Sequence, residues 1–237
     1  MPGISTCCLM GEPLAAALDR LAPLTDLIEI MDEGPHLITD PDLLSRYSQK
    51  FVLHAPFHGI NIASLFEPIR TASVQVTADC FKRAAVIGAV GVVVHPGYYA
   101  WEQERKDADR QFKKSLKELR LAAREYSATF WFENMGNMNF FNLRTPENLA
   151  LIGKTGLALD TGHAHLNRCL NEFLKTPFRH MHIHDNRGTA DTHSAIGDGT
   201  IDFVPVKKAL ERTSATAVLE MKDFSSVEKS LPVFDRM

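Results

Sequence analysis

Short apolar runs alternate with amphipathic helical patterns along the whole chain. Apolar runs of this length, rich in β-branched residues and bounded by Gly, Pro, Asn or Asp, are typical of strands buried on both faces. The predicted strands are Ile4–Met10, Leu27–Met31, Phe51–Ala55, Val90–Val94, Thr129–Phe132, Leu157–Leu159, Phe178–His184 and Ala217–Leu219. The predicted helices are Pro13–Leu24, Pro41–Ser48, Glu67–Gly88, Asp107–Tyr126, Pro146–Lys154, Asn167–Lys175, Phe203–Arg212 and Ser225–Phe234.

The pattern therefore repeats as eight β/α units without a linker that would divide it. Eight such units in 237 residues predict an α/β fold, a single (β/α)₈ TIM barrel that takes up residues 1–237 as one domain. A doubly wound sheet is the alternative, and we rank it lower because such sheets usually have fewer strands.

One stretch, from Arg179 to Asp202, carries the densest chemistry. His180, His182 and His184 alternate with apolar residues, so in a strand all three point to the same face. Imidazoles are poor core filling, because each needs hydrogen-bond partners once it is buried. A Gly- and Asp-rich loop with further carboxylate and imidazole groups follows directly. This combination at a strand end indicates a divalent transition metal such as zinc.

Polar residues able to bind metal also stand where the other apolar runs stop. In a barrel these positions open on the C-terminal face, where the active sites of such enzymes lie. They are His54, His95, Glu133, Asp160 with His163, His182 and Glu220, and the loop residues Asp191 and His193 fold back over the same mouth. Since one zinc ion takes three or four protein ligands, this many donors suits two or three ions.

Each candidate has an ordinary structural alternative. The carboxylates are also consistent with salt bridges inside the barrel, and the strand-end histidines with hydrogen bonds to backbone. Asp160 is equally a helix-capping residue, and loop polar groups are normally solvated. His184 is a candidate for contact with substrate. Aromatic residues near the mouth either stack on a sugar or base or pack the loops: Phe57, Tyr98, Tyr99 and Trp101.

Composition places few further limits. The net charge of -3 argues against a generally basic surface, so binding of nucleic acid would require a local patch. No apolar run is long enough to cross a bilayer, and we expect no membrane partner. The four cysteines lack zinc-type spacing, and Cys7 and Cys8 are adjacent inside the first predicted strand. Free, mostly buried thiols indicate a reducing compartment, so we expect a cytoplasmic protein.

The ordered set of motifs resembles the xylose-isomerase-like barrel superfamily, which includes sugar isomerases, sugar epimerases and endonuclease IV. The motifs are LHAPFHGINIAS, VVVHPG, FENMG, LDTGHAH, HMHIHD, DTHSAIGDG and LEMK, and they extend along essentially the whole chain. They are closest to the metal motifs of endonuclease IV. The resemblance places all nine ligand positions of its trinuclear zinc site on this chain: His54, His95, Glu133, Asp160, His163, His182, Asp191, His193 and Glu220.

The resemblance implies a polynuclear zinc phosphoester hydrolase in which Glu133 is the bridging carboxylate. The substrate would be abasic-site DNA or a small phosphorylated molecule. Two departures from endonuclease IV concern the substrate, because the chain is short and the segment MDEGPH after the second strand is acidic. An approaching phosphate backbone would favour Arg or Lys there.

The alternative is a sugar or sugar-phosphate isomerase or epimerase, for which the family needs only Glu133, Asp160, His182 and Glu220. A single divalent ion, such as manganese, would then serve. Glu133 and Glu220 would move protons beside a carbonyl, while His163 and His184 would hold hydroxyl groups. A barrel that binds metal or sugar without catalysis is the third possibility, because fold alone does not determine activity.

Overall fold

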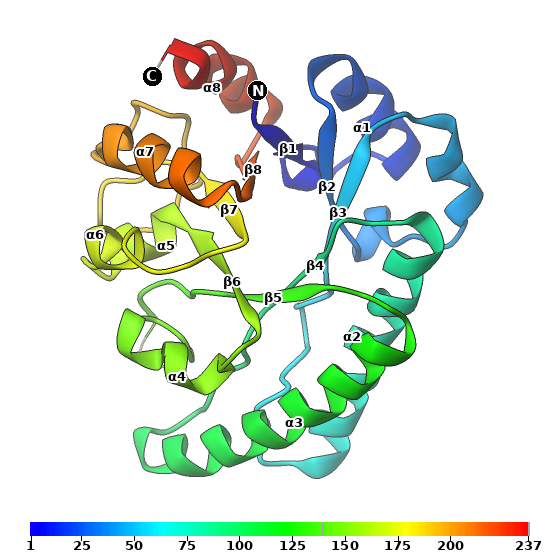
Figure 1. The fold of residues 1–237 in the computed structure, drawn as a ribbon, viewed down its shortest axis with the longest axis vertical. Helices are drawn as coiled ribbons and strands as arrows, with labels where there is room; N and C mark the ends of the chain where they lie inside the picture. The colour runs from blue at the N-terminus through cyan, green and yellow to red at the C-terminus, as the bar shows by residue number, and fades with distance from the viewer. Residues whose placement is uncertain (139, 237) are drawn as a thin grey trace.

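The computed structural model describes residues 1–138 and 140–236, and it is a closed parallel barrel whose strands follow chain order. The strands are β1 (Gly3–Ser5), β2 (Leu27–Met31), β3 (Lys50–His54), β4 (Val92–Val94), β5 (Phe130–Glu133), β6 (Gly156–Asp160), β7 (His180–Ile183) and β8 (Thr216–Leu219). Each strand pairs with the next, and β8 closes on β1. The predicted TIM barrel is confirmed (Figure 1).

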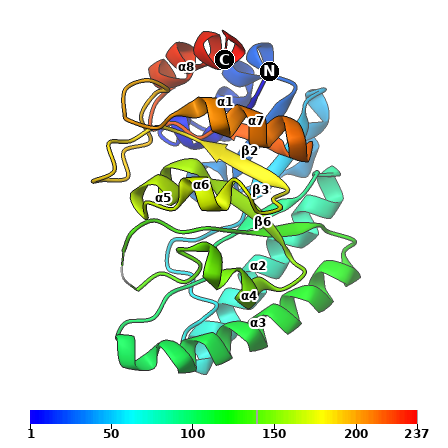
Figure 2. The same cartoon turned by 60° about the vertical axis from the view of Figure 1, so that its left-hand side comes forward.

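Helices surround this barrel (Figure 2). They are α1 (Leu14–Leu21), α2 (Glu67–Ile87), α3 (Arg105–Glu125), α4 (Leu149–Ile152), α5 (Thr161–Leu166), α6 (Leu170–Phe173), α7 (Phe203–Thr213) and α8 (Phe224–Arg236). The long helices α2 and α3 lie side by side, and α2 ends at Gly88, whose positive φ of 64° suits glycine at a helix C-terminus. Among the described residues, none of the helices combines the length and apolar character needed to cross a membrane.

Two apolar layers result from the alternation of side chains along the strands. The larger layer lies between the strands and the helices and includes Ile28, Ile30 and Phe132. The smaller layer fills the barrel and contains Val52, Val93, Trp131 and Ala158. Because the interior is small, the side chains that point inward near the strand ends are brought close to one another.

Three local predictions need correction. β1 ends at Ser5, and Thr6–Leu9 forms a 3₁₀ helix, because the Ser5 hydroxyl accepts a hydrogen bond from the Cys7 N–H. Cys7 and Cys8 therefore do not lie in a strand, although all four cysteines are free as expected.

The second correction concerns the helix predicted at Asn167–Lys175. Only α6, Leu170–Phe173, is α-helical there. The sequence reading missed α5, which ends as Arg168 takes a positive φ of 57°. The third correction concerns Pro41–Ser48, where residues Pro41–Arg46 form a 3₁₀ helix rather than an α-helix.

Candidate metal centre

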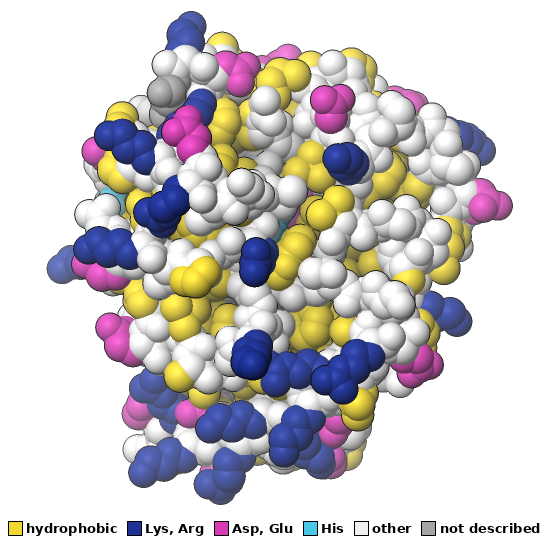
Figure 3. Space-filling view, viewed as in Figure 1, with side chains coloured by type: hydrophobic (Ala, Val, Ile, Leu, Met, Phe, Trp, Pro, Cys, Tyr) yellow, Lys and Arg dark blue, Asp and Glu magenta, His cyan; other side chains and the backbone are white. Residues whose placement is uncertain are grey.

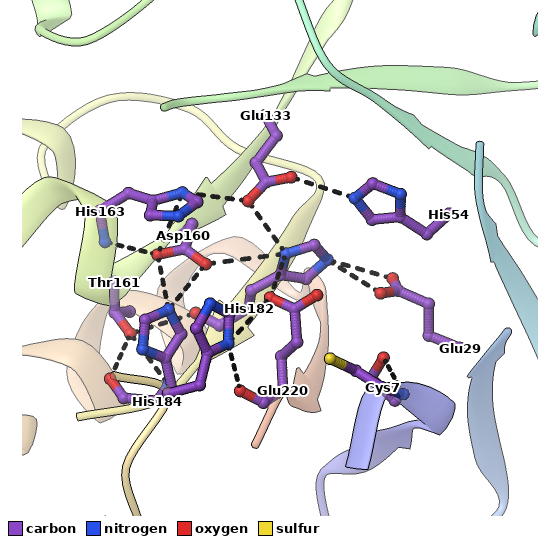
Figure 4. A network of polar contacts seen from close by, with 12 residues as sticks. Cys7, Glu29, His54, Glu133, Asp160, Thr161, His163, His182, His184 and Glu220 are labelled. Carbon is purple, nitrogen blue, oxygen red and sulfur yellow. Dashed lines mark hydrogen bonds and ion pairs between the residues drawn. The ribbon is translucent and has the colours of Figure 1, made fainter. Parts of the chain in front are cut away.

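Glu133, at the end of β5, contacts His54, His163 and His182 within a polar cluster (Figure 4). Its Oε2 atom is 3.3 Å from His54 Nε2 and 3.1 Å from His95 Nε2. Its Oε1 atom is 3.2 Å from His163 Nδ1 and 3.4 Å from His182 Nδ1. Each carboxylate oxygen thus faces two imidazoles from different segments of the chain, an arrangement that suits a carboxylate shared between two cations.

All nine residues predicted as ligands gather at this end of the barrel. The structure divides them into groups in which the candidate ligand atoms lie within 4.8 Å of one another. Three such groups contain the predicted ligands: His54, His95 and Glu133; then Glu133, Asp160, His182 and Glu220; and then His163, Asp191 and His193 together with His184. A fourth group consists of Glu29, His180 and His182. The parallel register explains the convergence, because Asp160 pairs directly with His182 on the neighbouring strand. Their roles as ligands remain predictions.

Three histidines have one ring nitrogen occupied by backbone. His54, His163 and His193 each place Nδ1 2.9 Å from a main-chain carbonyl, and a carbonyl can only accept, so Nδ1 carries the proton. The three acceptors are the carbonyls of Ala55, Asn134 and Glu220. In the neutral imidazole each Nε2 atom therefore carries the lone pair and points toward a carboxylate of the cluster, as a metal-binding histidine requires.

His182 is oriented the opposite way, by a residue that the sequence reading overlooked. Glu29, on β2, is fully buried inside the barrel, and its carboxylate is 3.1 Å from His182 Nε2. His180 Nε2 reaches the same carboxylate at 2.9 Å, and its Nδ1 contacts the Thr216 hydroxyl at 2.7 Å. A proton held on His182 Nε2 by Glu29 leaves Nδ1 free to bind metal. In the sequence, this role could have been recognised from the one carboxylate in the otherwise apolar strand LIEIM.

His184 lies behind Asp160 rather than at the cavity. Its Nε2 atom is 3.1 Å from both Asp160 carboxylate oxygens, its ring stacks on that of His193 at 3.9 Å, and it is fully buried. A Cβ atom on Gly162 would stand 2.0 Å from the His184 ring, so glycine is required there. This position favours a role in holding Asp160, and the catalytic role expected for His184 remains a prediction.

Asp160 serves two purposes at the start of α5. Its side chain caps that helix by accepting a 2.6 Å hydrogen bond from the His163 N–H. The structural alternative considered for Asp160, a helix cap, is therefore present, and it coexists with the approach of Asp160 Oδ2 to within 3.8 Å of His182 Nδ1. The same hydrogen bond fixes the position of His163 in the first turn of α5. From there His163 Nε2 lies 2.9 Å from the Asp191 carboxylate.

The buried carboxylates attract positive charge. Burial alone would raise the pKa of Glu133, but His182, His163 and His54 hold it well below its usual value. Burial would likewise raise the pKa of Glu220, yet His182 lowers it to about 2. Burial would lower the pKa of His54, but the hydrogen bond and charge of Glu133 raise it to about 9. The cluster thus stabilises cations, whether protons or metal ions.

The donor set fits a divalent metal of the zinc type. It consists of imidazole nitrogen and carboxylate oxygen, which are ligands of zinc and of similar ions. The buried Nδ1 atom of His182 has no hydrogen-bond partner among the described residues, yet it lies 3.3 Å from a Glu220 oxygen and 3.4 Å from a Glu133 oxygen. An unpartnered nitrogen beside two carboxylates is costly without a cation between them.

A cavity of about 410 Å³ opens above the cluster. The described residues that line it include neither Lys nor Arg, and its outer wall is apolar: Phe57, Ile60, Tyr98, Met135, Met138 and Phe141. Phe57 and Tyr98 thus lie in the wall of this cavity. Tyr99 is buried outside this lining, and Trp101 is 67% exposed.

Comparison with known proteins agrees with the barrel fold. A family model described as xylose isomerase-like TIM barrel matches residues 42–234. An uncharacterised protein of Methanocaldococcus jannaschii is 31% identical over 91% of this chain and 93% of its own length. A probable endonuclease 4 of Mycobacterium leprae is 28% identical, with 88% of each chain covered.

A solved structure described as a D-tagatose 3-epimerase-like protein superposes with a TM-score of 0.91. Its sequence is 29% identical, and the match covers 99% of this chain and 95% of that one. The relatives therefore include one protein named as a probable endonuclease and one described as epimerase-like.

Proposed function

The chain belongs to the xylose isomerase-like TIM-barrel family, and we propose that it is a divalent-metal-dependent phosphoester hydrolase with a polynuclear centre. The observation that carries this proposal is the ligand surplus around Glu133. A single ion would need only the group of Glu133, Asp160, His182 and Glu220. Two further groups, with five additional histidines and carboxylates predicted as ligands, lie on either side of it and have ring nitrogens already oriented toward carboxylates.

Each residue has a distinct part in this proposal. Glu133 would be shared between two ions, because its two oxygens face opposite groups. Asp160 and Glu220 hold the central position with His182, and Asp191 and His193 complete the outer position from the loop after β7. Bound divalent ions would supply a water of lowered pKa and neutralise charge on the phosphate. The apolar wall around Phe57 would exclude bulk water from the ester.

The cavity restricts the substrate. Neither Lys nor Arg is among the described residues that line the cavity, so the bound ions themselves would have to neutralise most of the charge of a phosphate group. The Mycobacterium leprae relative named endonuclease 4 supports a phosphodiester in DNA, and abasic-site duplex is the first substrate to test. A small phosphate ester is the second, because the cavity is compact.

A single-metal sugar isomerase or epimerase is the second candidate. The absence of Lys and Arg from the described lining of the cavity favours it, and so does the similarity to the epimerase-like structure. In that case Glu133 and Glu220 would be the proton-transferring carboxylates on either side of one ion, with manganese as an alternative to zinc.

The deciding experiment is the metal content of protein purified without added metal, measured by elemental mass spectrometry. The proposal expects two or three zinc-type ions per chain, one of which is lost in His54→Ala and another in His193→Ala. His165→Ala is the matched control, because His165 contacts the Thr200 hydroxyl and belongs to none of the ligand groups. A single ion that depends on Glu220 but survives both substitutions would refute the polynuclear centre and favour the epimerase.

A further inference from the structure

A second cavity, of about 630 Å³, opens at the opposite end of the barrel. Its walls come from the C-terminal part of α3 and from the residues that begin β5, β6, β7 and β8. Four of the lining residues are cations and none is acidic: Arg120, Arg124, Lys154 and Arg179. Figure 3 shows this side of the molecule, with Lys and Arg side chains gathered between the centre of the barrel and α3.

These cations lack counter-ions within the described part of the chain. The half-buried Arg120 guanidinium donates only to neutral oxygens, the Thr155 hydroxyl at 2.9 Å and the Ile152 carbonyl at 3.0 Å. Arg124, Lys154 and Arg179 form no ion pair with any described carboxylate, whereas Arg70 on α2 is paired with both Glu67 and Glu118. Uncompensated positive charge around a concavity attracts anions.

The floor and rim add neutral hydrogen-bonding groups. Trp131 lines the cavity, its ring is held by stacking on His180 at 5.4 Å, and no described residue accepts a hydrogen bond from its indole N–H. Two hydroxyl-bearing residues, Thr129 and Ser214, stand at the rim. The charged lining groups are all donors, as a tetrahedral oxyanion requires.

We propose that this cavity binds a phosphate group, either free inorganic phosphate or the phosphate of a small phosphorylated molecule. Arg124, Lys154 and Arg179 bind the anion from the rim, Arg120 contributes charge from the side, and the Trp131 indole donates from below. This cavity and the cluster around Glu133 lie at opposite ends of the barrel. The phosphate site therefore does not depend on the reaction proposed for that cluster.

The chain contains a built-in reporter for the test. It has two tryptophans, and the exposed Trp101 lies away from this cavity, so Trp101→Phe leaves Trp131 as the sole indole. Purified Trp101→Phe protein is titrated with sodium phosphate and, separately, with glucose 6-phosphate, at constant ionic strength set with chloride. Indole fluorescence and isothermal calorimetry are recorded in both titrations. A saturable response identifies binding, and the two ligands distinguish inorganic phosphate from a phosphate ester.

The decisive comparison uses two charge-matched double variants. Arg179→Gln with Lys154→Gln removes two rim cations, and we expect the Kd to rise at least about tenfold as charge-assisted hydrogen bonds are lost. Lys113→Gln with Lys117→Gln removes the same charge from exposed positions of α3 outside the cavity, and the Kd should stay within about twofold. Circular dichroism verifies that both variants fold.

Three results would overturn the proposal. The first is the absence of saturable binding of either ligand to the Trp101→Phe protein. The second is an equal loss of affinity in both double variants, which would show attraction by net charge alone. The third is binding that survives the rim substitutions but disappears when metal is chelated, which would place the phosphate at the Glu133 cluster instead.

Discussion

Replacement of Glu29 by Gln tests whether the barrel interior prepares His182 to bind metal. The substitution keeps the size of the side chain and removes its charge. Both Glu29 oxygens lie 3.1 Å from His182 Nε2, and the Gln amide would place an N–H group at one of these two positions. Two N–H donors would then face each other in a fully buried position, and the unfavourable contact is relieved when the proton moves to His182 Nδ1. That nitrogen would no longer be available to a metal ion.

The expected loss of metal affinity follows from the role of carboxylates that orient a histidine ligand. Loss of the group that orients a histidine ligand lowers metal affinity about 10- to 100-fold, or about 1.4 to 2.7 kcal/mol. The effect should be confined to the central group, because His54 and His193 are oriented by backbone carbonyls instead. We therefore expect one ion per chain to be released at chelator concentrations that the unchanged protein withstands, while the others remain.

Competition with a chromophoric chelator measures this affinity, and elemental mass spectrometry counts the remaining ions. Glu228→Gln, an exposed change of the same kind on α8, is the control and should leave both values unchanged. A Glu29→Gln protein that is correctly folded by circular dichroism and binds all its metal within about twofold of the original affinity would refute the reasoning.

Four further outcomes follow from the same contacts. First, the metal-free protein should be most thermally stable between about pH 4.5 and 6.5: the stabilisation from His54 and His193, whose pKa values are raised from 6.5 to about 9, is present below pH 6.5 and lost as pH rises through 9. The stabilisation from Glu220, whose pKa is lowered from 4.5 to about 2, is present above pH 4.5 and lost as pH falls through 2; melting curves across this range would contradict the assignment if stability increased from pH 6.5 to 9. Second, metal binding should release protons at pH 7, because the same histidines must lose them, and calorimetry in buffers of different ionisation enthalpy should show it as a buffer-dependent heat. Third, Gly162→Ala should destabilise the fold by about 1–3 kcal/mol and reduce metal content, since the added Cβ meets the His184 ring; urea unfolding with unchanged midpoint would exclude the contact. Fourth, Asp185→Asn should release the ion bound by Asp191 and His193, because Asp185 accepts hydrogen bonds from Gly197, Gly199 and Ile201 N–H groups that hold their loop; metal counting against Asp198→Asn, an exposed change in the same loop, is the check.

Much of the fold was readable from local pattern. β2 was predicted with its observed bounds, Leu27–Met31, because a buried parallel strand is a continuous apolar run and needs no long-range information to recognise. Errors occurred where a short-range hydrogen bond competes with the pattern. The Ser5 hydroxyl ends β1 early, and Asp160 starts a helix that apolar periodicity did not signal.

The sequence by itself determined which donors stand at the strand ends, because polar residues that interrupt apolar runs are conspicuous, and the barrel topology then brings those ends together. Only the tertiary structure decided which nitrogen each histidine presents, since that depends on acceptors remote in the chain: Glu29 lies on β2 and His182 on β7. It also revealed the basic cavity at the other end, whose residues come from five separate segments and show no local motif. Hydrophobic periodicity and composition determine the helices and strands. The orientation of a histidine ring and the enclosure of a cavity depend on contacts that form only when the barrel closes.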